Sequence, residues 1–434
     1  MGLEPVVVFG RPLLRTACMG PAFYRKPAQL YATHAAIAHA TPALPTGRSK
    51  GRSTVPRYWG LDLHKRYVHA CEWVTATQKE RHFRFPNTPE GWAQFAAGEL
   101  GPDCWVAIEV TGSAFEVHDW LSPRVGRVLL ANPVELKRLG SGRHTDRVDA
   151  ARLAKMLAMG ILPTVWVPPP AVREVRRLLR YRHSLQVSRT RAYNQARAVL
   201  RRHGIHLPSR AELPEQLTEA HWRALPGGDR VILASAVAQV VRLGQELAAL
   251  DAEILRRVAS YPEVGRLLTI TGVGPITAAT LWAFIGDAAR FPNAKCLARY
   301  AGLDPSVHQS GESHYQGAIS RNGNGLLRAC LVEAAHVVAR FDAGGLGAFF
   351  RRKLPQLGYK RAVVALARKL LVVAWRLMLR GDTYRAARMK TVRNKRWALQ
   401  KLQEQALDWE ARIRRLLAIG VEESASRDRT KVPA

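Results

Sequence analysis

The fold is decided by residues 58–63, which read YWGLDL and form a short apolar run carrying a single acidic residue. A second strand-like run covers residues 67–74, and residues 81–85 alternate between apolar and polar side chains as a third. Three short strands in immediate succession, joined by short connections, predict an antiparallel meander.

Helix and strand signals alternate after this meander. Residues 89–97 read as a helix, and residues 104–110 read as a buried strand that carries an acid near its end. A helix near residues 115–121 leads to a strand at 127–130, and a helix over about 146–159 closes the unit. A meander followed by a βαβ order predicts an α/β domain.

The charge of the chain is strongly positive. The 434 residues include 66 Lys and Arg against 34 Asp and Glu, which gives a formal net charge of +32. Hydrophobic residues make up 47% of the chain, as in a globular protein, so the charge does not indicate bulk disorder. This excess of positive charge argues against an ordinary metabolic enzyme. A polyanionic partner is expected: nucleic acid first, and an acidic membrane surface second.

The five cysteines are scattered and form no CxxC pair, which argues against a zinc site and against a disulfide framework. Such usage suits the reducing cytoplasm of a bacterial cell. No apolar run approaches the roughly 18 residues that a membrane span needs. We therefore expect no membrane association.

Composition changes divide the chain into five segments. Residues 1–57 are basic and lack any sustained period. They are either a disordered arm or a segment upstream of the true translation start, for example Met19. The predicted organisation is a basic extension at 1–57, an α/β domain at 58–170, a helical or coiled-coil arm at 171–263, a mainly helical, serine-containing domain at 264–382, and a basic helix and tail at 383–434.

The arm is expected to contain two long amphipathic helices. Its first helix has a heptad-like apolar stripe with Arg182 and Arg189 in the seam, and many arginines against the single acid Glu174. Two long helices with a loop between them suggest a dimerisation arm that also contacts nucleic acid, or a helical spacer with a solvated charged face. The arginines expected to bind nucleic acid are Arg173, Arg176, Arg177, Arg180, Arg189 and Arg191.

Four acids of the α/β domain can converge. Asp62 and Glu109 lie in otherwise apolar strands, where an unpaired charge costs several kcal/mol. Asp146 and Asp149 are three residues apart and share one face of a helix. Oxygen ligands of this kind suit Mg²⁺ or Mn²⁺. The alternative is that the two aspartates only favour a helix N-terminus and that Glu109 pairs with an arginine.

Two glycine-rich segments stand out further along. Gly272 and Gly274 read as a helix–hairpin–helix-like turn that could grip a phosphate, or as a plain turn between two core helices. Ser310 lies beside glycine in a polar loop, with Arg321 and Arg328 nearby. It could attack a phosphate, and a simple Ser-Gly turn is the alternative.

These residues together resemble a known family. The blocks are GLDLHK, AIEVTGS, HTDRVDAARLAKML, ITGVGPITAATLWAFIGDAARF and ARYAGLDPSVHQSGESHYQGAISRNGNGLLRACL, in this order over residues 58–381. They are similar to insertion-sequence transposases with an N-terminal Holliday-junction-resolvase-like domain carrying a DEDD acid set and a C-terminal serine domain. Such proteins are understood as bridge-RNA-guided DNA recombinases.

The resemblance implies a RuvC-like (RNase H-like) α/β fold for the first domain. It implies that Asp62, Glu109, Asp146 and Asp149 bind Mg²⁺ or Mn²⁺ and that Ser310 is the nucleophile, ahead of Ser313 and Ser320. It also implies donor and target DNA, a guide (bridge) RNA, and a homo-oligomer, a dimer that assembles to a tetramer. One subunit's carboxylates would then work with a partner's serine.

The resulting prediction is a metal-dependent, RNA-guided recombinase that mobilises its own insertion element. Two rivals use fewer of these features. A structure-selective junction endonuclease would need only the acids, with water as nucleophile, and a non-catalytic nucleic-acid-binding protein would need neither site.

Overall fold

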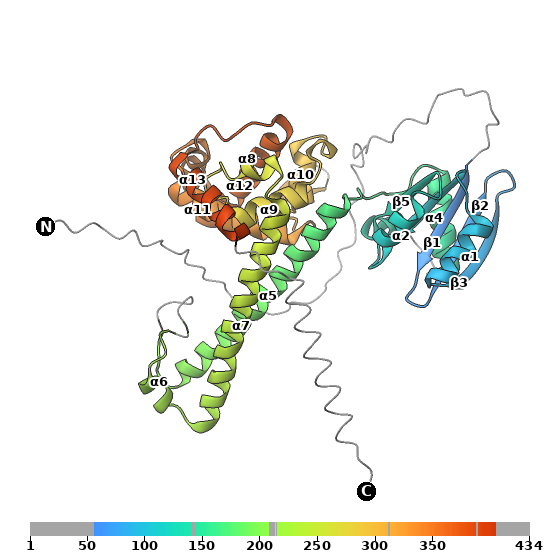
Figure 1. Ribbon diagram of the computed structural model, residues 1–434. Helices are drawn as coiled ribbons and strands as arrows, with labels where there is room; N and C mark the ends of the chain where they lie inside the picture. The colour runs from blue at the N-terminus through green and yellow to red at the C-terminus, as the bar shows by residue number, and fades with distance from the viewer. Residues whose placement is uncertain are drawn as a thin grey trace, which may run out of the picture. The chain divides into compact units, whose positions relative to one another are not determined.

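The computed structural model describes residues 56–139, 145–207, 213, 215–310, 313–387 and 389–404, and of these only the backbone at 307–310, 313–316 and 402–404 (Figure 1). The extension at 1–55 and the end of the tail lie outside these residues. The described chain forms two compact units, divided at Pro170. Each unit is described by itself.

The first unit is built on a five-stranded sheet in the order β3-β2-β1-β4-β5. The strands are β1 (Arg57–Leu63), β2 (Tyr67–Val74), β3 (Lys79–Pro86), β4 (Cys104–Glu109) and β5 (Arg127–Ala131). The first three pair antiparallel as a meander, whereas β1, β4 and β5 run parallel. The predicted mixed α/β sheet is therefore confirmed.

Helices cover both faces of this sheet. They are α1 (Pro89–Glu99), α2 (Ala114–Leu121), α3 (Pro133–Leu139) and α4 (Asp146–Ala158). Side chains of α1 and α2 share one core cluster with Trp59 and Leu61, while α3 and α4 pack with Ala107 on the other face. Double coverage explains why β4 reads as a continuous apolar run rather than an alternating one. Helix α3 was not expected from the sequence.

Gly60 lets α4 lie directly against the middle of the sheet. A Cβ atom at this position would stand 2.0 Å from the carbonyl oxygen of Ala150 and 2.6 Å from the amide nitrogen of Ala154. Any side chain on Gly60 would therefore push the helix away from β1. Because α4 begins at Asp146, this close approach also sets where its first turn lies.

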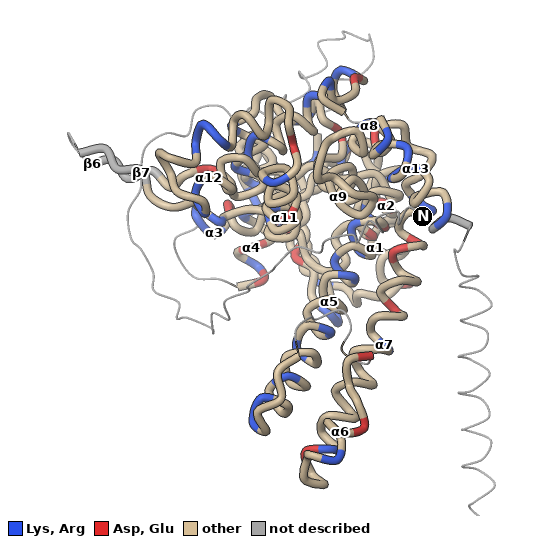
Figure 2. Tube along the Cα trace, turned by 90° about the vertical axis from the view of Figure 1, so that its left-hand side faces the viewer, with Lys and Arg blue, Asp and Glu red and all other residues tan. Residues whose placement is uncertain are grey.

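The second unit begins with two long helices, α5 (Pro170–Arg202) and α7 (Gly227–Val258), which pack side by side (Figure 1). The short α6 (Glu219–Arg223) lies in the connection between them. Lysines and arginines follow one another along α5, whereas α7 carries fewer (Figure 2). One predicted seam arginine, Arg182, is paired across the two helices with the carboxylate of Asp251.

Among the described helices, α7 is long and apolar enough to cross a membrane by length and composition. This corrects the expectation that no apolar segment reaches that length. Length and composition alone are weak evidence for a membrane span, because the core helices of soluble proteins can have the same length and composition. The apolar side of α7 is buried against α5 through residues such as Leu243, Leu247 and Leu250.

The rest of the unit is mainly helical and surrounds a large apolar core. Its elements are α8 (Pro262–Leu267), α9 (Pro275–Ile285), the 3-10 turn η1 (Ala288–Arg290), α10 (Ala294–Tyr300), β6 (Pro305–Ser310), β7 (Ser313–Ile319), α11 (Gly325–Phe341), α12 (Gly345–Arg380) and α13 (Met389–Glu404). Helix α12 kinks at Gly358, whose φ is +68°, just after Pro355. The part of α12 beyond this kink belongs to the segment that the sequence predicts to be mainly helical.

Helix α13, in the basic C-terminal segment, docks on this core. Val392 is buried, and the Lys395 ammonium donates to the carbonyl oxygens of Leu268 and Ile270 at 3.0 and 2.8 Å. These carbonyls follow the C-terminus of α8, where helical acceptors are left over. Part of the predicted tail therefore belongs to the folded unit.

Candidate metal centre and nucleic-acid surfaces

Asp62 and Glu109 are neighbours on adjacent strands. β1 and β4 run parallel with Leu61 opposite Ile108, so the next residue on each strand is an acid. The Asp62 side chain is only 18% exposed, and Glu109 is half-buried. The sequence-based expectation that these two acids lie at the same end of the sheet is met.

Asp146 and Asp149 lie in the first turn of α4. The Thr145 hydroxyl accepts a hydrogen bond from the amide of Val148, which caps the helix and fixes its start. Because α4 packs against β1 and β2, this first turn comes to the strand ends that carry the other acids. Asp149 is also 3.9 Å from the Arg152 guanidinium.

A histidine and a tyrosine complete the cluster, and sequence reasoning missed both. His64 Nε2 lies 3.1 Å from Asp62 Oδ2 and 3.3 Å from Asp146 Oδ1. The Tyr67 hydroxyl donates to Asp146 Oδ2 at 2.7 Å. A signal for His64 was present, because it follows Asp62 by two residues and side chains two apart on a strand point the same way.

The carboxylates of this cluster repel one another, and the repulsion adds to the pKa shifts of Asp62 and Glu109. Burial raises the pKa of Asp62, and the charges of Asp146 and Asp149 add to the rise while His64 opposes it. Burial likewise raises the pKa of Glu109, and Asp62 and Asp149 add to it. Asp146 differs, because the Tyr67 hydrogen bond lowers its pKa. Mutually repelling carboxylates of this kind are stabilised by a bound cation.

The donor set fits a divalent cation. One ligand atom each from Asp62, His64 and Asp146 can be chosen so that all lie within 4.8 Å of one another. Carboxylate oxygens suit Mg²⁺, and an added imidazole nitrogen suits Mn²⁺ as well. The cluster therefore has the chemistry to hold a metal ion at the ends of β1 and β4.

Two family models match the chain. A transposase model named for its DEDD residues covers residues 59–205, and the model described as "Transposase IS116/IS110/IS902 family" covers residues 264–351. The chain belongs to this family of transposases. Transposition cuts and rejoins DNA strands, so the protein is an enzyme that acts on DNA.

Individual relatives agree with this family. The transposase of insertion sequence element IS1111A from Coxiella burnetii is 28% identical over 75% of this chain and 90% of its own length. The pilin gene-inverting protein of Moraxella bovis is 29% identical, over 73% of this chain and 94% of its own. The transposase of IS1328 from Yersinia enterocolitica is 26% identical, over 75% and 97%.

The arginines of the transposase's α5 do not all face the same way. Arg177, Arg180 and Arg191 are exposed, and Arg173 and Arg189 are half-buried. Arg176 is buried and donates to the carbonyl oxygens of Ala283 and Phe284 in α9, at 2.7 and 3.2 Å. Its guanidinium thus holds two helices together, which corrects the expectation that it contacts nucleic acid.

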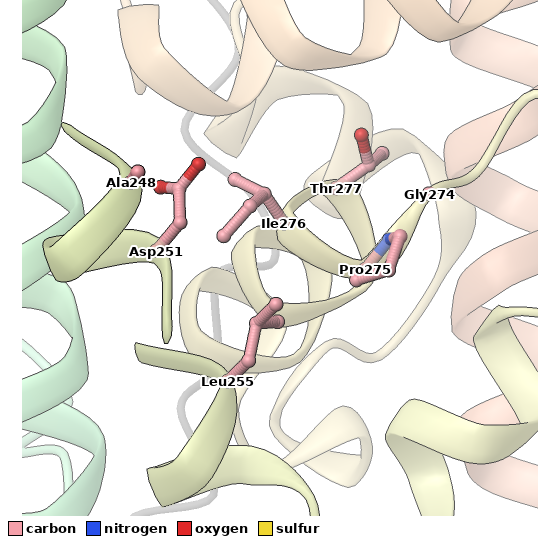
Figure 3. A pocket seen from close by; sticks show the side chains of 7 residues that line it. All are labelled: Ala248, Asp251, Leu255, Gly274, Pro275, Ile276 and Thr277. Atoms are coloured by element: carbon pink, nitrogen blue, oxygen red, sulfur yellow. The ribbon is translucent and has the colours of Figure 1, made fainter. Parts of the chain in front are cut away.

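The glycine turn before α9 has a packing reason. Gly272 has φ of +80°, and a Cβ atom there would stand 2.7 Å from the Ala334 carbonyl oxygen of α11. At the start of α9, a cavity of about 360 Å³ is lined by Gly274 and its successors and by residues of α7, among them Asp251 (Figure 3).

The serine segment of the transposase forms a β-hairpin. Ser310 is the last residue of β6 and pairs with Ser313, the first residue of β7. At the base of the hairpin the Ser320 hydroxyl donates to Asp304 Oδ1 at 2.6 Å. Arg321 is exposed with φ of +56°, and Arg328 donates to the Ala301 carbonyl oxygen at 3.2 Å, so Arg328 also supports the local fold.

Proposed function

We propose that the transposase uses a metal-bound carboxylate cluster and Ser310 to cut and rejoin DNA strands. The metal-bound cluster is inferred from one observation: Asp62, Glu109 and the first turn of α4 converge at one end of a mixed sheet. A meander followed by parallel strands, with acids at adjacent strand ends, is the plan of a RuvC-like domain. We therefore assign Asp62, Glu109, Asp146 and Asp149 as metal ligands, oriented by His64 and Tyr67.

A bound Mg²⁺ or Mn²⁺ would neutralise charge on the scissile phosphate and stabilise the leaving oxygen. The Ser310 hydroxyl loses its proton as its oxygen attacks phosphorus, and the phosphorus–O3′ bond breaks. The released 3′ oxygen takes up a proton. The phosphoserine ester preserves a phosphodiester-like bond, so rejoining to a new 3′ hydroxyl needs no nucleotide cofactor.

The position of Ser310 supports this role. Residues at the end of a β-hairpin can approach an extended substrate, and loop positions on a rigid scaffold often carry function. Ser310 belongs to the second unit, whereas the carboxylates belong to the first. We propose that the reaction brings a serine and a carboxylate cluster together in an oligomer, and that one subunit's serine serves another subunit's metal.

We further propose that a guide RNA selects the donor and target sequences by base pairing. The exposed arginines Arg177, Arg180 and Arg191 follow one helix and would contact phosphates, which carry no sequence information. Arg173, Arg189 and Arg321 are the further candidates for such contacts, together with the amide of Gly274. Sequence choice then has to come from the nucleic acid partner.

The test is recombination of donor and target plasmids by purified protein and guide RNA. Ser310→Ala and Asp62→Ala should each abolish recombination, whereas the matched control Ser313→Ala, across the end of the hairpin, should retain it. EDTA should abolish activity and Mg²⁺ restore it. Full recombination by Ser310→Ala would refute the assignment of Ser310 as nucleophile. The remaining hypothesis would be a hydrolytic nuclease that uses only the acids. Full activity in EDTA would refute the dependence of the reaction on a bound metal ion.

A further inference from the structure

A second cluster of metal-ligand side chains lies on β2 and β3, apart from the four acids. Cys71 and His82 are directly opposite each other in the antiparallel register, and Glu80 lies two residues before His82. The distance from Cys71 Sγ to His82 Nε2 is 4.0 Å, and Glu80 Oε2 is 2.8 Å from the same nitrogen. One donor atom from each residue lies within 4.8 Å of the other two.

We propose that Cys71, Glu80 and His82 bind a zinc ion, with water completing a tetrahedral site. Sulfur and imidazole ligands favour zinc over magnesium, unlike the oxygen-rich cluster at the ends of β1 and β4. The scattered cysteines argue against a paired-cysteine zinc site, but this site needs a single cysteine. Its other ligands come from the facing strand, whose register the sequence does not show.

The spacing of the donor atoms suits such an ion. Tetrahedral zinc with bonds of about 2.0–2.3 Å places its ligand atoms roughly 3.3–3.6 Å apart. The sulfur–nitrogen distance therefore has to close by about 0.4 Å, and the nitrogen–oxygen distance has to open by about 0.5 Å. Glu80 is partly exposed, so its carboxylate can make most of this adjustment.

Each ligand already has the second partner that an oriented metal ligand needs. His82 Nδ1 is 3.3 Å from His69 Nε2, which leaves Nε2 of His82 directed at the cluster. This second ring can orient the His82 imidazole through that contact. Lys155 of α4 holds Glu80 Oε1 at 2.6 Å, which leaves Oε2 to the metal.

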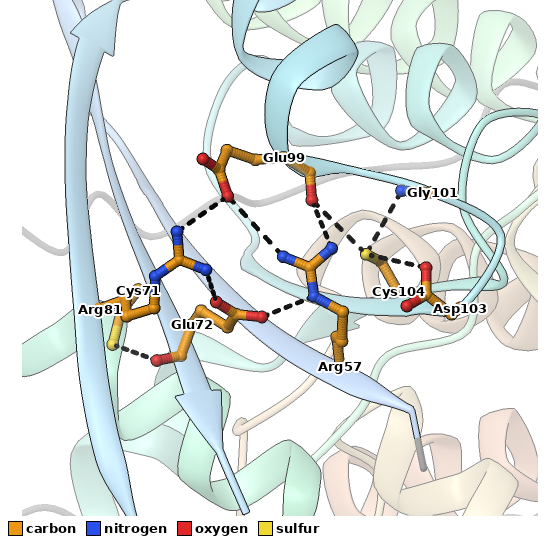
Figure 4. Close-up of polar contacts among 8 residues, drawn as sticks. All are labelled: Arg57, Cys71, Glu72, Arg81, Glu99, Gly101, Asp103 and Cys104. Atoms are coloured by element: carbon orange, nitrogen blue, oxygen red, sulfur yellow. Dashed lines mark hydrogen bonds and ion pairs between the residues drawn. The ribbon is translucent and has the colours of Figure 1, made fainter. Parts of the chain in front are cut away.

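The thiol of Cys71 lies between β2 and α4. Cys71 is fully buried, packs against Ala150 and Ala151 of α4, and donates weakly to the Glu72 carbonyl oxygen at 3.7 Å (Figure 4). Burial raises the pKa of this thiol to about 12, so the free thiol stays protonated. Zinc binding would release that proton, and the new thiolate would offset part of the ion's charge, while the Glu80 carboxylate would be shared between the ion and Lys155.

The neighbouring acids Glu72 and Glu99 belong to a separate network with arginines. Glu72 is 2.6 Å from Arg57 and 2.7 Å from Arg81, and Glu99 joins the same network (Figure 4). Zinc at Cys71, Glu80 and His82 would connect the β2–β3 hairpin to α4 through Lys155. It would thereby steady the helix that carries Asp146 and Asp149, without taking part in the chemistry.

The test is a cobalt titration of the full-length protein after chelation, in excess Mg²⁺ to occupy the oxygen-rich site. Wild type should take up one Co²⁺ with a thiolate-to-cobalt charge-transfer band, and zinc should displace it. Cys71→Ser should lose this band. His82→Gln should either lose the band or bind Co²⁺ with an affinity at least tenfold lower than that of wild type. Cys296→Ser and Asp62→Asn should keep it.

A structural control separates impaired binding from impaired folding. Zinc should raise the thermal midpoint of wild type and of Cys296→Ser but not that of Cys71→Ser, whose circular dichroism should match wild type. The proposal is overturned if wild type shows no thiolate band, if the band survives in Cys71→Ser, or if zinc stabilises Cys71→Ser as much as wild type.

Discussion

His64 and Tyr67 decide how the carboxylates are held. His64 lies between Asp62 and Asp146, so a polar ring separates two charges that repel each other. Tyr67 donates to the other oxygen of Asp146 and fixes its orientation. A metal ligand with both oxygens oriented needs less rearrangement when the ion binds.

Tyr67→Phe should weaken metal binding most at acid pH. Without this hydrogen bond the pKa of Asp146 rises towards its ordinary value, so protons compete with the metal at a higher pH than in wild type. Mn²⁺ affinity measured by calorimetry should stay close to that of wild type at neutral pH and should fall below it as the pH approaches 3.8, the ordinary pKa of the carboxyl group. Tyr58→Phe is the control, and an equal decrease at both pH values would contradict the mechanism.

At the scale of elements, α4 brings the two halves of the acid cluster together. Its apolar residues Leu153 and Leu157 pack on the sheet, its N-terminus is capped by Thr145, and Gly60 gives it room. The sequence pattern was sufficient to predict the helix and its face. It was not sufficient to show that Gly60 is the contact point, because that depends on how closely two elements approach.

Gly60→Ala should displace α4 and separate its acids from Asp62 and Glu109. Overpacking of this kind costs about 1–3 kcal/mol, so a lower thermal midpoint is expected along with a loss of metal-dependent cleavage. Gly98→Ala is the matched control, since a Cβ atom at Gly98 meets nothing within 4 Å. Wild-type activity and stability in Gly60→Ala would show that α4 is not held in this way.

How far the sequence predicts each part depends on the range of the interaction. The strands β1 to β5 follow from apolar or alternating runs, and the placement of Asp62 and Glu109 at one end of the sheet follows from the acids that β1 and β4 carry near their ends. The cluster of Cys71 and His82 depends on an antiparallel register that no local pattern specifies. Arg176 was misassigned for the same reason, because its charge is visible in the sequence but its carbonyl partners on α9 are not.

Across the whole molecule, the net charge of +32 is divided between structural and solvent-facing arginines. Replacing Arg177, Arg180 and Arg191 with Gln should weaken DNA and RNA binding without sequence preference. The slope of log K against log salt concentration should become shallower by about 0.9 for each phosphate that the variant no longer neutralises. Fluorescence anisotropy at several salt concentrations measures both effects.

Arg176→Met provides the contrast. This variant removes the Arg176 hydrogen bonds to two carbonyl oxygens of α9, of which Phe284 keeps a donor in Arg290, so it should lower the thermal midpoint while leaving the salt slope unchanged. An unchanged slope in the triple variant would show that α5 does not contact phosphates.

Above all, we propose that the transposase holds DNA covalently through Ser310 while strands are exchanged. The most direct measurement is denaturing electrophoresis of the protein after reaction with end-labelled DNA, guide RNA and Mg²⁺, followed by mass spectrometry of the attached residue. The account predicts a covalent adduct on Ser310 that is absent in Ser310→Ala and absent in EDTA, and that persists in Ser313→Ala. DNA cleaved to free ends without an adduct, or an adduct that survives in Ser310→Ala, would contradict it.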